Sequence, residues 1–351
     1  MDRSFLLLLP ALLIGCPGPN EKADDTGEDQ DTNACGEEEV IIDETIPAQG
    51  STSHYYMADL EFHLSDPDPT GATIVTDIPG TQMESEDGEI IYWVLDAPLE
   101  PSTSYCATLE YCGGDAEICF STSALGTPLS DPQILVDRTY ALDLQNARIV
   151  VPEGIGSVLT SYLTQDILVG VASIEGSDIQ MNGAIGVEGA DPPAQDYCDP
   201  TIAFPVADFS ASPYFQIGPQ TTTLSVAGFE IEIQDLEITG TFASDGSYFG
   251  GGTLSGTIDT RPLVGLVDDS TNPDPNTICD LATSFGASCV DCSDGEPYCL
   301  TLVADQINAD EVSGLTIMEV GGNDCTGCET WTQDTVPAVE AQECPVEDTG
   351  E

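Results

Sequence analysis

The stretch Leu60-Glu61-Phe62-His63-Leu64 decides the fold of the first half of this chain. Its three apolar residues alternate with a glutamate and a histidine. Successive side chains of a β-strand point to opposite faces, so this alternation predicts a strand with one buried and one wet face.

More strands are expected around it, between residues 37 and 127. Residues 90–95 read Ile-Ile-Tyr-Trp-Val-Leu, a continuous apolar run that is typical of a central strand in a sandwich. Residues 105–111 alternate again, and Pro67 and Gly80 are among the residues that separate the runs. Several short strands within one region of this length predict a β-sandwich.

Four motifs in this region occur in a recognisable order. They are Pro47-Ala48-Gln49-Gly50, Leu60-x-Phe62-x-Leu64-Ser65-x-Pro67, Pro98-Leu99-x-Pro101-x-Thr103-x-Tyr105 and Phe120-x-Thr122. In that order they resemble the bacterial Ig-like domain of surface-layer proteins, the SbsA-type family. The cysteines at 106, 112 and 119 depart from the usual pattern of the family. The resemblance implies a spacer or adhesive module and brings no catalytic residues.

Residues 128–335 predict a second, larger domain. Strand-like runs such as 167–174, 236–242 and 248–258 are separated by turn signals, of which Ser244-Asp245-Gly246-Ser247 indicates a hairpin. Apolar spacing predicts a short helix at 155–163, and we expect further short helices at 261–267 and 277–285. Gly250-Gly251-Gly252 indicates a bend or bulge. We expect a mainly β protein, in which the Ig-like sandwich is followed by an antiparallel β-domain, barrel or sandwich, with short helices.

The N-terminal residues resemble the leader of a bacterial lipoprotein. Arg3 precedes an apolar run at 5–14, and Leu13-Ile14-Gly15-Cys16 resembles a lipobox. The run is too short for a spanning helix, which needs about 20 residues. The resemblance implies that residues 1–15 are removed and Cys16 is acylated. Because Pro17 follows, and not aspartate, it favours the outer membrane of a Gram-negative bacterium. The alternative is an ordinary signal peptide with a chance cysteine.

Acidic segments flank the two predicted domains. Residues 16–36 cannot bury enough apolar surface to fold, so we expect the lipidated cysteine to be followed by a disordered tether. Residues 336–351 form an acidic tail.

Acidity dominates the composition, because the net charge is −58 and only five residues are basic. Such a surface repels phosphate backbones, which excludes nucleic acid as a partner. It also repels anionic headgroups, so the acyl chain must supply the membrane affinity. We expect Arg138, Arg148 and Arg261 to serve as structural ion-pair partners.

Two explanations of this acidity stay open: solubility in a salty habitat, and specific calcium sites. The sequence leaves calcium open as a cofactor, although no acidic turn fits the spacing of an EF-hand. The calcium candidates are Asp66, Asp68, Asp268, Asp269 and Asp274.

Thirteen cysteines are present, and lipidation of Cys16 leaves an even number, which predicts six disulfides in an oxidising compartment. The first half holds Cys35, Cys106, Cys112 and Cys119, and the second holds Cys198, Cys279, Cys289, Cys292, Cys299, Cys325, Cys328 and Cys344. Each group can pair within itself. We favour Cys112 with Cys119, which flank Gly113-Gly114-Asp115. The Cys-x-x-Cys pairs at 289–292 and 325–328 also leave zinc binding and redox chemistry open.

No catalytic motif stands out, and only two histidines occur, so we expect no catalysis. The leading hypothesis is a membrane-anchored extracytoplasmic lipoprotein with a structural, adhesive or binding role, whose partners are the membrane and envelope or surface components. The alternative is that the second β-domain binds lipid or a small apolar ligand, and an enzyme ranks third. Exposure of Tyr214, Phe215, Tyr248 and Phe249 would indicate an adhesive surface, although ordinary core positions are the simpler expectation.

Overall fold

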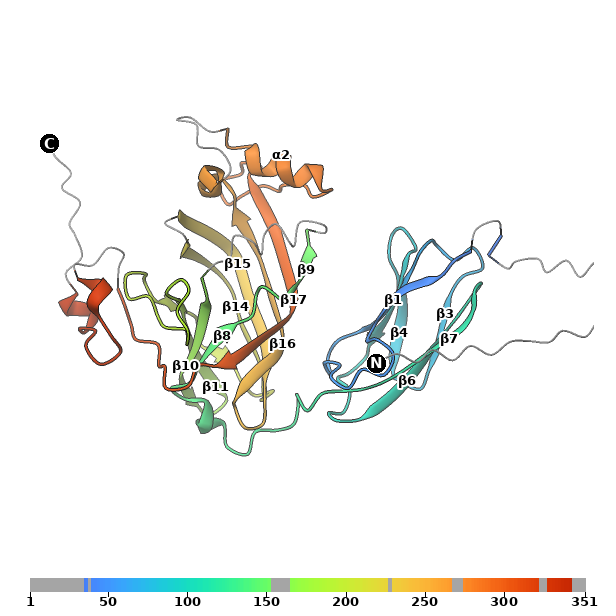
Figure 1. Cartoon of the computed structure of the whole chain (residues 1–351), viewed down its shortest axis with the longest axis horizontal. Coiled ribbons are helices and arrows are strands. Elements are labelled where there is room, and N and C mark those ends of the chain that lie inside the picture. Colours follow the sequence, from blue (N-terminus) through green and yellow to red (C-terminus); the bar gives the residue numbers. More distant parts are fainter. Residues whose placement is uncertain are drawn as a thin grey trace, which may run out of the picture.

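The computed structural model describes residues 35–36, 39–152, 165–226, 229–266, 274–321 and 327–342. Within them the chain forms a β-sandwich followed by a larger, nearly closed barrel-like sheet (Figure 1). The expected fold class is therefore confirmed: mainly β, with a sandwich followed by a larger antiparallel domain. The helix expected at 155–163 lies outside the described residues.

The sandwich consists of two antiparallel sheets. One has the order β1 (Ile42–Ile46), β2 (Leu60–Leu64), β5 (Ile90–Leu95), β4 (Gly80–Glu84), and the other has the order β3 (Thr73–Thr76), β6 (Ser104–Tyr111), β7 (Gly114–Ser121). Lettered in chain order, these sheets are A-B-E-D and C-F-G, which is the arrangement of a constant-type immunoglobulin domain.

Local patterning explains these strands. Leu60, Phe62 and Leu64 of β2 are buried, as their alternation predicted. β5 lies between β2 and β4, although only Ile91 of its apolar run is buried. At the start of β6, the hydroxyl of Tyr105 accepts a hydrogen bond from the backbone N–H of Glu100 at 3.0 Å, an arrangement like the tyrosine corner of immunoglobulin domains.

A single side chain covers part of the edge of β3. The amide of Gln82 in β4 donates to the carbonyl oxygen of Ala72 at 2.8 Å, and its Oε1 accepts from the N–H of Ile74 at 2.7 Å. Gln82 thus occupies the place of a neighbouring strand and satisfies backbone groups that an edge leaves unpaired.

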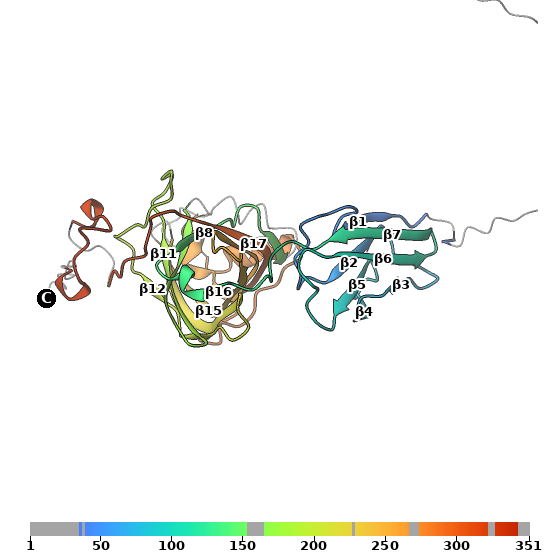
Figure 2. The same cartoon turned by 90° about the horizontal axis from the view of Figure 1, so that it is seen from below.

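The second unit is a ten-stranded antiparallel sheet whose strand order is β12-β11-β10-β8-β17-β16-β15-β14, with β13 beside β11 and β9 beside β17. Since β13 also contacts β14, the sheet curls almost into a barrel (Figure 2). The strands are β8 (Thr139–Leu142), β9 (Arg148–Val151), β10 (Ile167–Glu175), β11 (Asp178–Ile185), β12 (Ile202–Ala203), β13 (Ala207–Asp208), β14 (Tyr214–Val226), β15 (Phe229–Phe242), β16 (Tyr248–Asp259) and β17 (Cys299–Glu311).

Short helical segments connect or follow these strands. The helix expected at 277–285 is α2 (Thr277–Ser284), and the one expected at 261–267 is a 3-10 turn, η2 (Arg261–Leu266). Further 3-10 turns are η1 (Pro132–Leu135), η3 (Cys328–Thr330) and η4 (Val339–Ala341). No helix within the described residues is both long enough and apolar enough to cross a membrane.

An aromatic cluster fills part of the interior of the barrel. Phe242 lies at its centre, with ring centroids 4.9 Å from Phe215, 5.4 Å from Tyr140, 5.7 Å from Phe249 and 6.1 Å from Phe209. All five side chains are buried, so the core interpretation of Phe215 and Phe249 is confirmed.

The hairpin between β15 and β16 follows the sequence signals closely. Phe242 and Phe249 are paired across it, and residues 244–247 form the turn. The expected bulge at Gly250-Gly251-Gly252 is present as a shift in register between Phe249 and Gly252, where β16 pairs with β17.

Replacing the central ring of the aromatic cluster should destabilise the barrel strongly. We expect Phe242→Ala to lower the free energy of unfolding by about 3–5 kcal/mol, because the lost contacts leave a cavity among four other rings. Urea unfolding of the oxidised protein, followed by near-ultraviolet circular dichroism, measures this. Phe285→Ala, at an exposed position, should change it by no more than about 0.5 kcal/mol. Equal effects of the two substitutions would contradict the described core.

Candidate functional site

Disulfides are the best-defined chemical feature of the described residues. They are Cys35–Cys112, Cys106–Cys119, Cys198–Cys328, Cys279–Cys289 and Cys292–Cys299. Each joins cysteines from the same half of the chain, as expected. Cys325 and Cys344, the remaining candidates, lie outside the described residues, and so does Cys16, the proposed lipidation site.

The predicted pair Cys112–Cys119 is wrong. The hairpin of β6 and β7 has its two-residue turn at Cys112-Gly113, not at residues 113–115. This register places Cys106 directly opposite Cys119, with their Cα atoms 4.1 Å apart. Cys112, at the tip of the hairpin, pairs with Cys35.

Three of the four cysteines in the Cys-x-x-Cys pairs form disulfides, as expected, and are not ligands of the zinc site that was left open. Cys289 and Cys292 belong to two different disulfides, and Cys328 pairs with Cys198, so their sulfurs are not free thiolates. Three clusters of three metal-ligating side chains occur within the described part of the chain, and each includes both sulfurs of one disulfide.

The described calcium candidates serve as turn residues or lie exposed. Asp68 accepts hydrogen bonds from the N–H of Thr70 at 2.8 Å and from that of Cys112 at 3.2 Å. Asp274 accepts from the N–H of Asn276 at 2.9 Å, and Asp66 is exposed. None of these three aspartates belongs to a cluster of metal-ligating groups found among the described residues. The candidates Asp268 and Asp269 lie outside that part of the chain.

Aspartate closes turns elsewhere in the chain as well. The carboxylates of Asp208 and Asp245 each accept from the N–H and the hydroxyl of the serine two positions later. Asp87 accepts from the hydroxyl of Ser85 at 2.6 Å. These hydrogen bonds stabilise the ionised form and lower the pKa of all three carboxyls. Part of the acidity therefore has a local structural role.

The three arginines form ion pairs, as expected. Arg138 binds Glu311 at 3.0 Å, Arg148 binds Glu61 at 3.0 Å and Asp305 at 2.7 Å, and Arg261 binds Asp259 and Asp294, both at 2.6 Å. Two of the three guanidinium groups thus join two carboxylates each.

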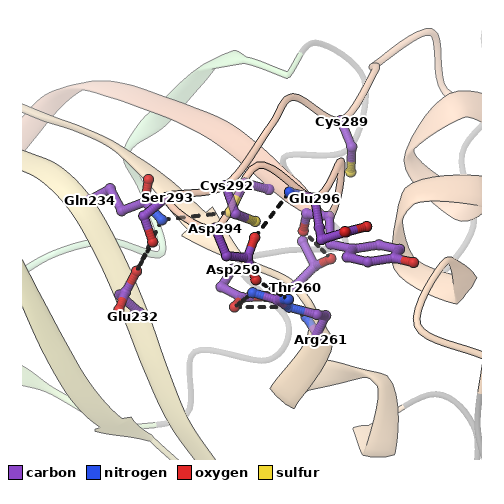
Figure 3. The surroundings of a disulfide bond; sticks show 12 residues. Glu232, Gln234, Asp259, Thr260, Arg261, Cys289, Cys292, Ser293, Asp294 and Glu296 are labelled. Atoms are coloured by element: carbon purple, nitrogen blue, oxygen red, sulfur yellow. Dashed lines mark hydrogen bonds and ion pairs between the residues drawn. A yellow bond between two sulfur atoms is a disulfide. The ribbon is translucent and has the colours of Figure 1, made fainter.

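Arg261 organises one end of the barrel (Figure 3). Asp259 ends β16, and the guanidinium of Arg261 forms a fork with its carboxylate while reaching Asp294 in the loop before β17. The ring of Tyr298 lies 5.5 Å from the guanidinium carbon. The hydrogen bonds to Asp259 and then to Asp294 raise the pKa of Arg261 above its ordinary value.

Two disulfides complete this region, which we call the stapled cap: α2 together with residues 285–299. Cys279–Cys289 ties α2 to the loop after it, and Cys292–Cys299 ties that loop to the start of β17. The inner side of the cap buries Ala282 against Leu300.

The outer side of the stapled cap exposes three apolar side chains. The exposed fractions are 41% for Leu281, 43% for Phe285 and 43% for Val290. Sequence reasoning missed this surface, because it considered aromatic residues in strands. The signal that could have found it is the i, i+4 spacing of Leu281 and Phe285 at the C-terminal end of the predicted helix.

Both histidines have structural partners. The buried ring of His54 contacts the edge of Phe120 and hydrogen bonds the carbonyl oxygen of Ala58 at 3.0 Å, and burial lowers its pKa. His63, expected at an exposed strand position, is instead half-buried, with Nε2 2.8 Å from Oε2 of Glu61.

Glu61 is a carboxylate with two charged or polar partners at the boundary of the two units. Its side chain is 13% exposed, and it meets His63 of the same strand and Arg148 of the barrel. Burial opposes its ionised form, but the hydrogen bonds from Arg148 and His63 outweigh burial and lower the pKa of Glu61.

Peptide mapping under non-reducing conditions tests the disulfide pattern. A protease specific for acidic residues can cut at Glu110, Asp115 and Glu117, which separates Cys106, Cys112 and Cys119. We expect linked peptides that contain Cys35 with Cys112 and Cys106 with Cys119. A linkage of Cys112 to Cys119 in the native protein would contradict the described hairpin.

Acidification should weaken the protein partly through Glu61. Because its pKa is lower in the folded chain than in the unfolded chain, its stabilising contribution is present above the unfolded pKa and is lost as pH falls through the folded pKa. We expect Glu61→Gln to lower the melting temperature at pH 7 and to reduce the further fall in melting temperature between pH 7 and pH 3. Glu86→Gln, at an exposed turn, should show the same fall in melting temperature between pH 7 and pH 3 as the wild type. If the melting temperature of Glu61→Gln fell on acidification as much as that of the wild type, Glu61 would not contribute to the acid sensitivity.

Comparisons with known proteins add little to these observations. No protein-family model and no curated protein matches the chain. Among solved structures, an L,D-transpeptidase from Mycobacterium smegmatis aligns with 40% of this chain and 75% of its own, at 13% sequence identity and a TM-score of 0.20. A similarity this slight carries no argument about fold or activity, so the site is interpreted from its own chemistry.

Proposed function

We propose that this chain is an extracytoplasmic lipoprotein, anchored through Cys16, with a structural or adhesive role and no catalytic one. The observation that carries this proposal is the set of five disulfides within the described residues. Disulfides persist in oxidising compartments, which agrees with the address that the lipobox-like stretch 13–16 implies.

The architecture supports different roles for the two units. An immunoglobulin-like strand order, together with the four motifs that resemble the SbsA-type family, suits the sandwich to a spacer role. The barrel would then carry the contact surface. Its aromatic core favours a structural or adhesive role over a carrier of lipid or small apolar ligands, since rings already occupy that part of the interior.

The stapled cap is the part of the barrel that we propose for contact with envelope or surface components. Leu281, Phe285 and Val290 are exposed there, on a frame held by two disulfides and by Arg261. A rigid apolar surface loses little conformational entropy on binding. The net charge of −58 argues against nucleic acid as a partner, because it repels phosphate backbones.

Metabolic labelling tests the anchor. The full chain is produced in a Gram-negative host with an alkyne analogue of palmitate, and we expect the wild type to carry the label and to sediment with membranes. Cys16→Ala should lose the label, because it lacks the thiol that is acylated. An unlabelled, soluble wild-type protein would refute the proposal.

Two further variants in the same host test whether the lipoprotein is anchored in the outer or the inner membrane. Pro17→Asp should move the labelled protein from outer-membrane to inner-membrane fractions. Pro19→Asp adds the same charge two residues later and should leave the distribution unchanged. Inner-membrane wild-type protein would overturn the outer-membrane assignment and leave the anchor intact.

A further inference from the structure

The apolar core of the sandwich includes barrel residues where the two units meet, although the barrel has a separate core of its own. Tyr56 and Leu125 belong to the core of the sandwich, and the same cluster includes Ala243 of the barrel, with Tyr248 packed against it. These barrel residues flank the turn between β15 and β16. The two units therefore bury apolar surface against each other.

The bulge in β16 is shaped for a tyrosine of the sandwich. Gly251 has a φ of +60°, and a Cβ atom there would collide with the ring of Tyr55. The hydroxyl of Tyr55 lies 2.7 Å from Oγ1 of Thr241 in β15, and burial raises the pKa of this tyrosine. The glycine that bends the strand thus also admits the aromatic ring.

A charged contact joins the same units on other strands. Arg148 in β9 donates from Nη1 and Nη2 to Glu61 in β2, at 3.2 and 3.0 Å. It also donates from Nε and Nη2 to Asp305 in β17, at 2.9 and 2.7 Å. Because the guanidinium is planar, holding both carboxylates fixes the direction in which Glu61 lies from the barrel.

Each contact alone would leave the units free to turn about it. The Tyr55 contact involves β15 and β16, whereas the Arg148 contact involves β9 and β17. Contacts on different strands restrict rotation in different directions. Linked domains move relative to each other by default unless their interface is extensive. A fixed angle between the two units therefore requires specific contacts.

We propose that the sandwich and the barrel form one rigid body, and that Arg148 is the positioning residue that fixes the angle between them. This inference does not rest on the lipid anchor, because it concerns contacts between described residues only. The spacer and the surface it presents would then move as a unit.

Distance measurement by pulsed electron resonance tests the joint. Spin labels are attached through non-canonical amino acids at Glu86 in the sandwich and Glu175 in the barrel, both exposed, so that the native cysteines stay oxidised. We expect a single narrow distance distribution for the wild type. Arg148→Gln should broaden it, because Glu61 loses its partner across the joint.

A matched control separates the joint from general loss of stability. Arg261→Gln removes ion pairs to Asp259 and Asp294, both within the barrel, so its distance distribution should stay narrow. Arg148→Lys keeps the charge but cannot form a fork with two carboxylates, and we expect it to broaden the distribution less than glutamine does. This variant serves as the test if Arg148→Gln does not fold, as judged by circular dichroism.

Two results would overturn the proposal. One is a broad distribution in the wild type, which means that the units move independently. The other is a narrow distribution in folded Arg148 variants, which means that the apolar contact alone fixes the angle. Neither result bears on the palmitate label, so failure of this inference is distinguishable from failure of the proposed function.

Discussion

Repulsion between carboxylates is the constraint under which the rest of this structure forms. With a net charge of −58, the chain has few cations to offset that repulsion, and three arginines supply all of them after Lys22. Arg148 and Arg261 each hold two carboxylates, and both join separate segments of the fold. The disulfides and the aspartate-capped turns resist the repulsion in other ways, through covalent bonds and through hydrogen bonds that favour the ionised carboxylate.

Short-range patterns predicted most strands, and long-range pairing explains what they missed. The alternation in residues 60–64 predicted β2, because the period of two is a local property. Whether the second domain was a barrel or a sandwich depends on the approach of β13 to β14, which no local pattern encodes. The Cys112 pairing failed for a local reason, because a shift in the position of one turn changes every partner across a hairpin.

The candidate site was still harder to predict. Arg148 was expected to form ion pairs, but its partners, Glu61 and Asp305, lie 87 and 157 residues away in sequence. The stapled cap depends on two disulfides whose pairing cannot be deduced from cysteine spacing alone. The acidic turn at Asp66 and Asp68 suggested metal ligands, yet Asp68 accepts a hydrogen bond from the N–H of Thr70 and closes the turn. Composition therefore could not separate local capping from ion binding.

The small amide contact at the edge of β3 matters when many copies stand close together. Proteins confined to a surface meet one another at high local density, and an open strand edge is a template on which a neighbour's backbone can continue the sheet. Gln82 uses up the carbonyl oxygen of Ala72 and the N–H of Ile74 within its own molecule. At this position the fold engages two backbone groups that a neighbour would otherwise pair with, which hinders the growth of a shared sheet under crowding.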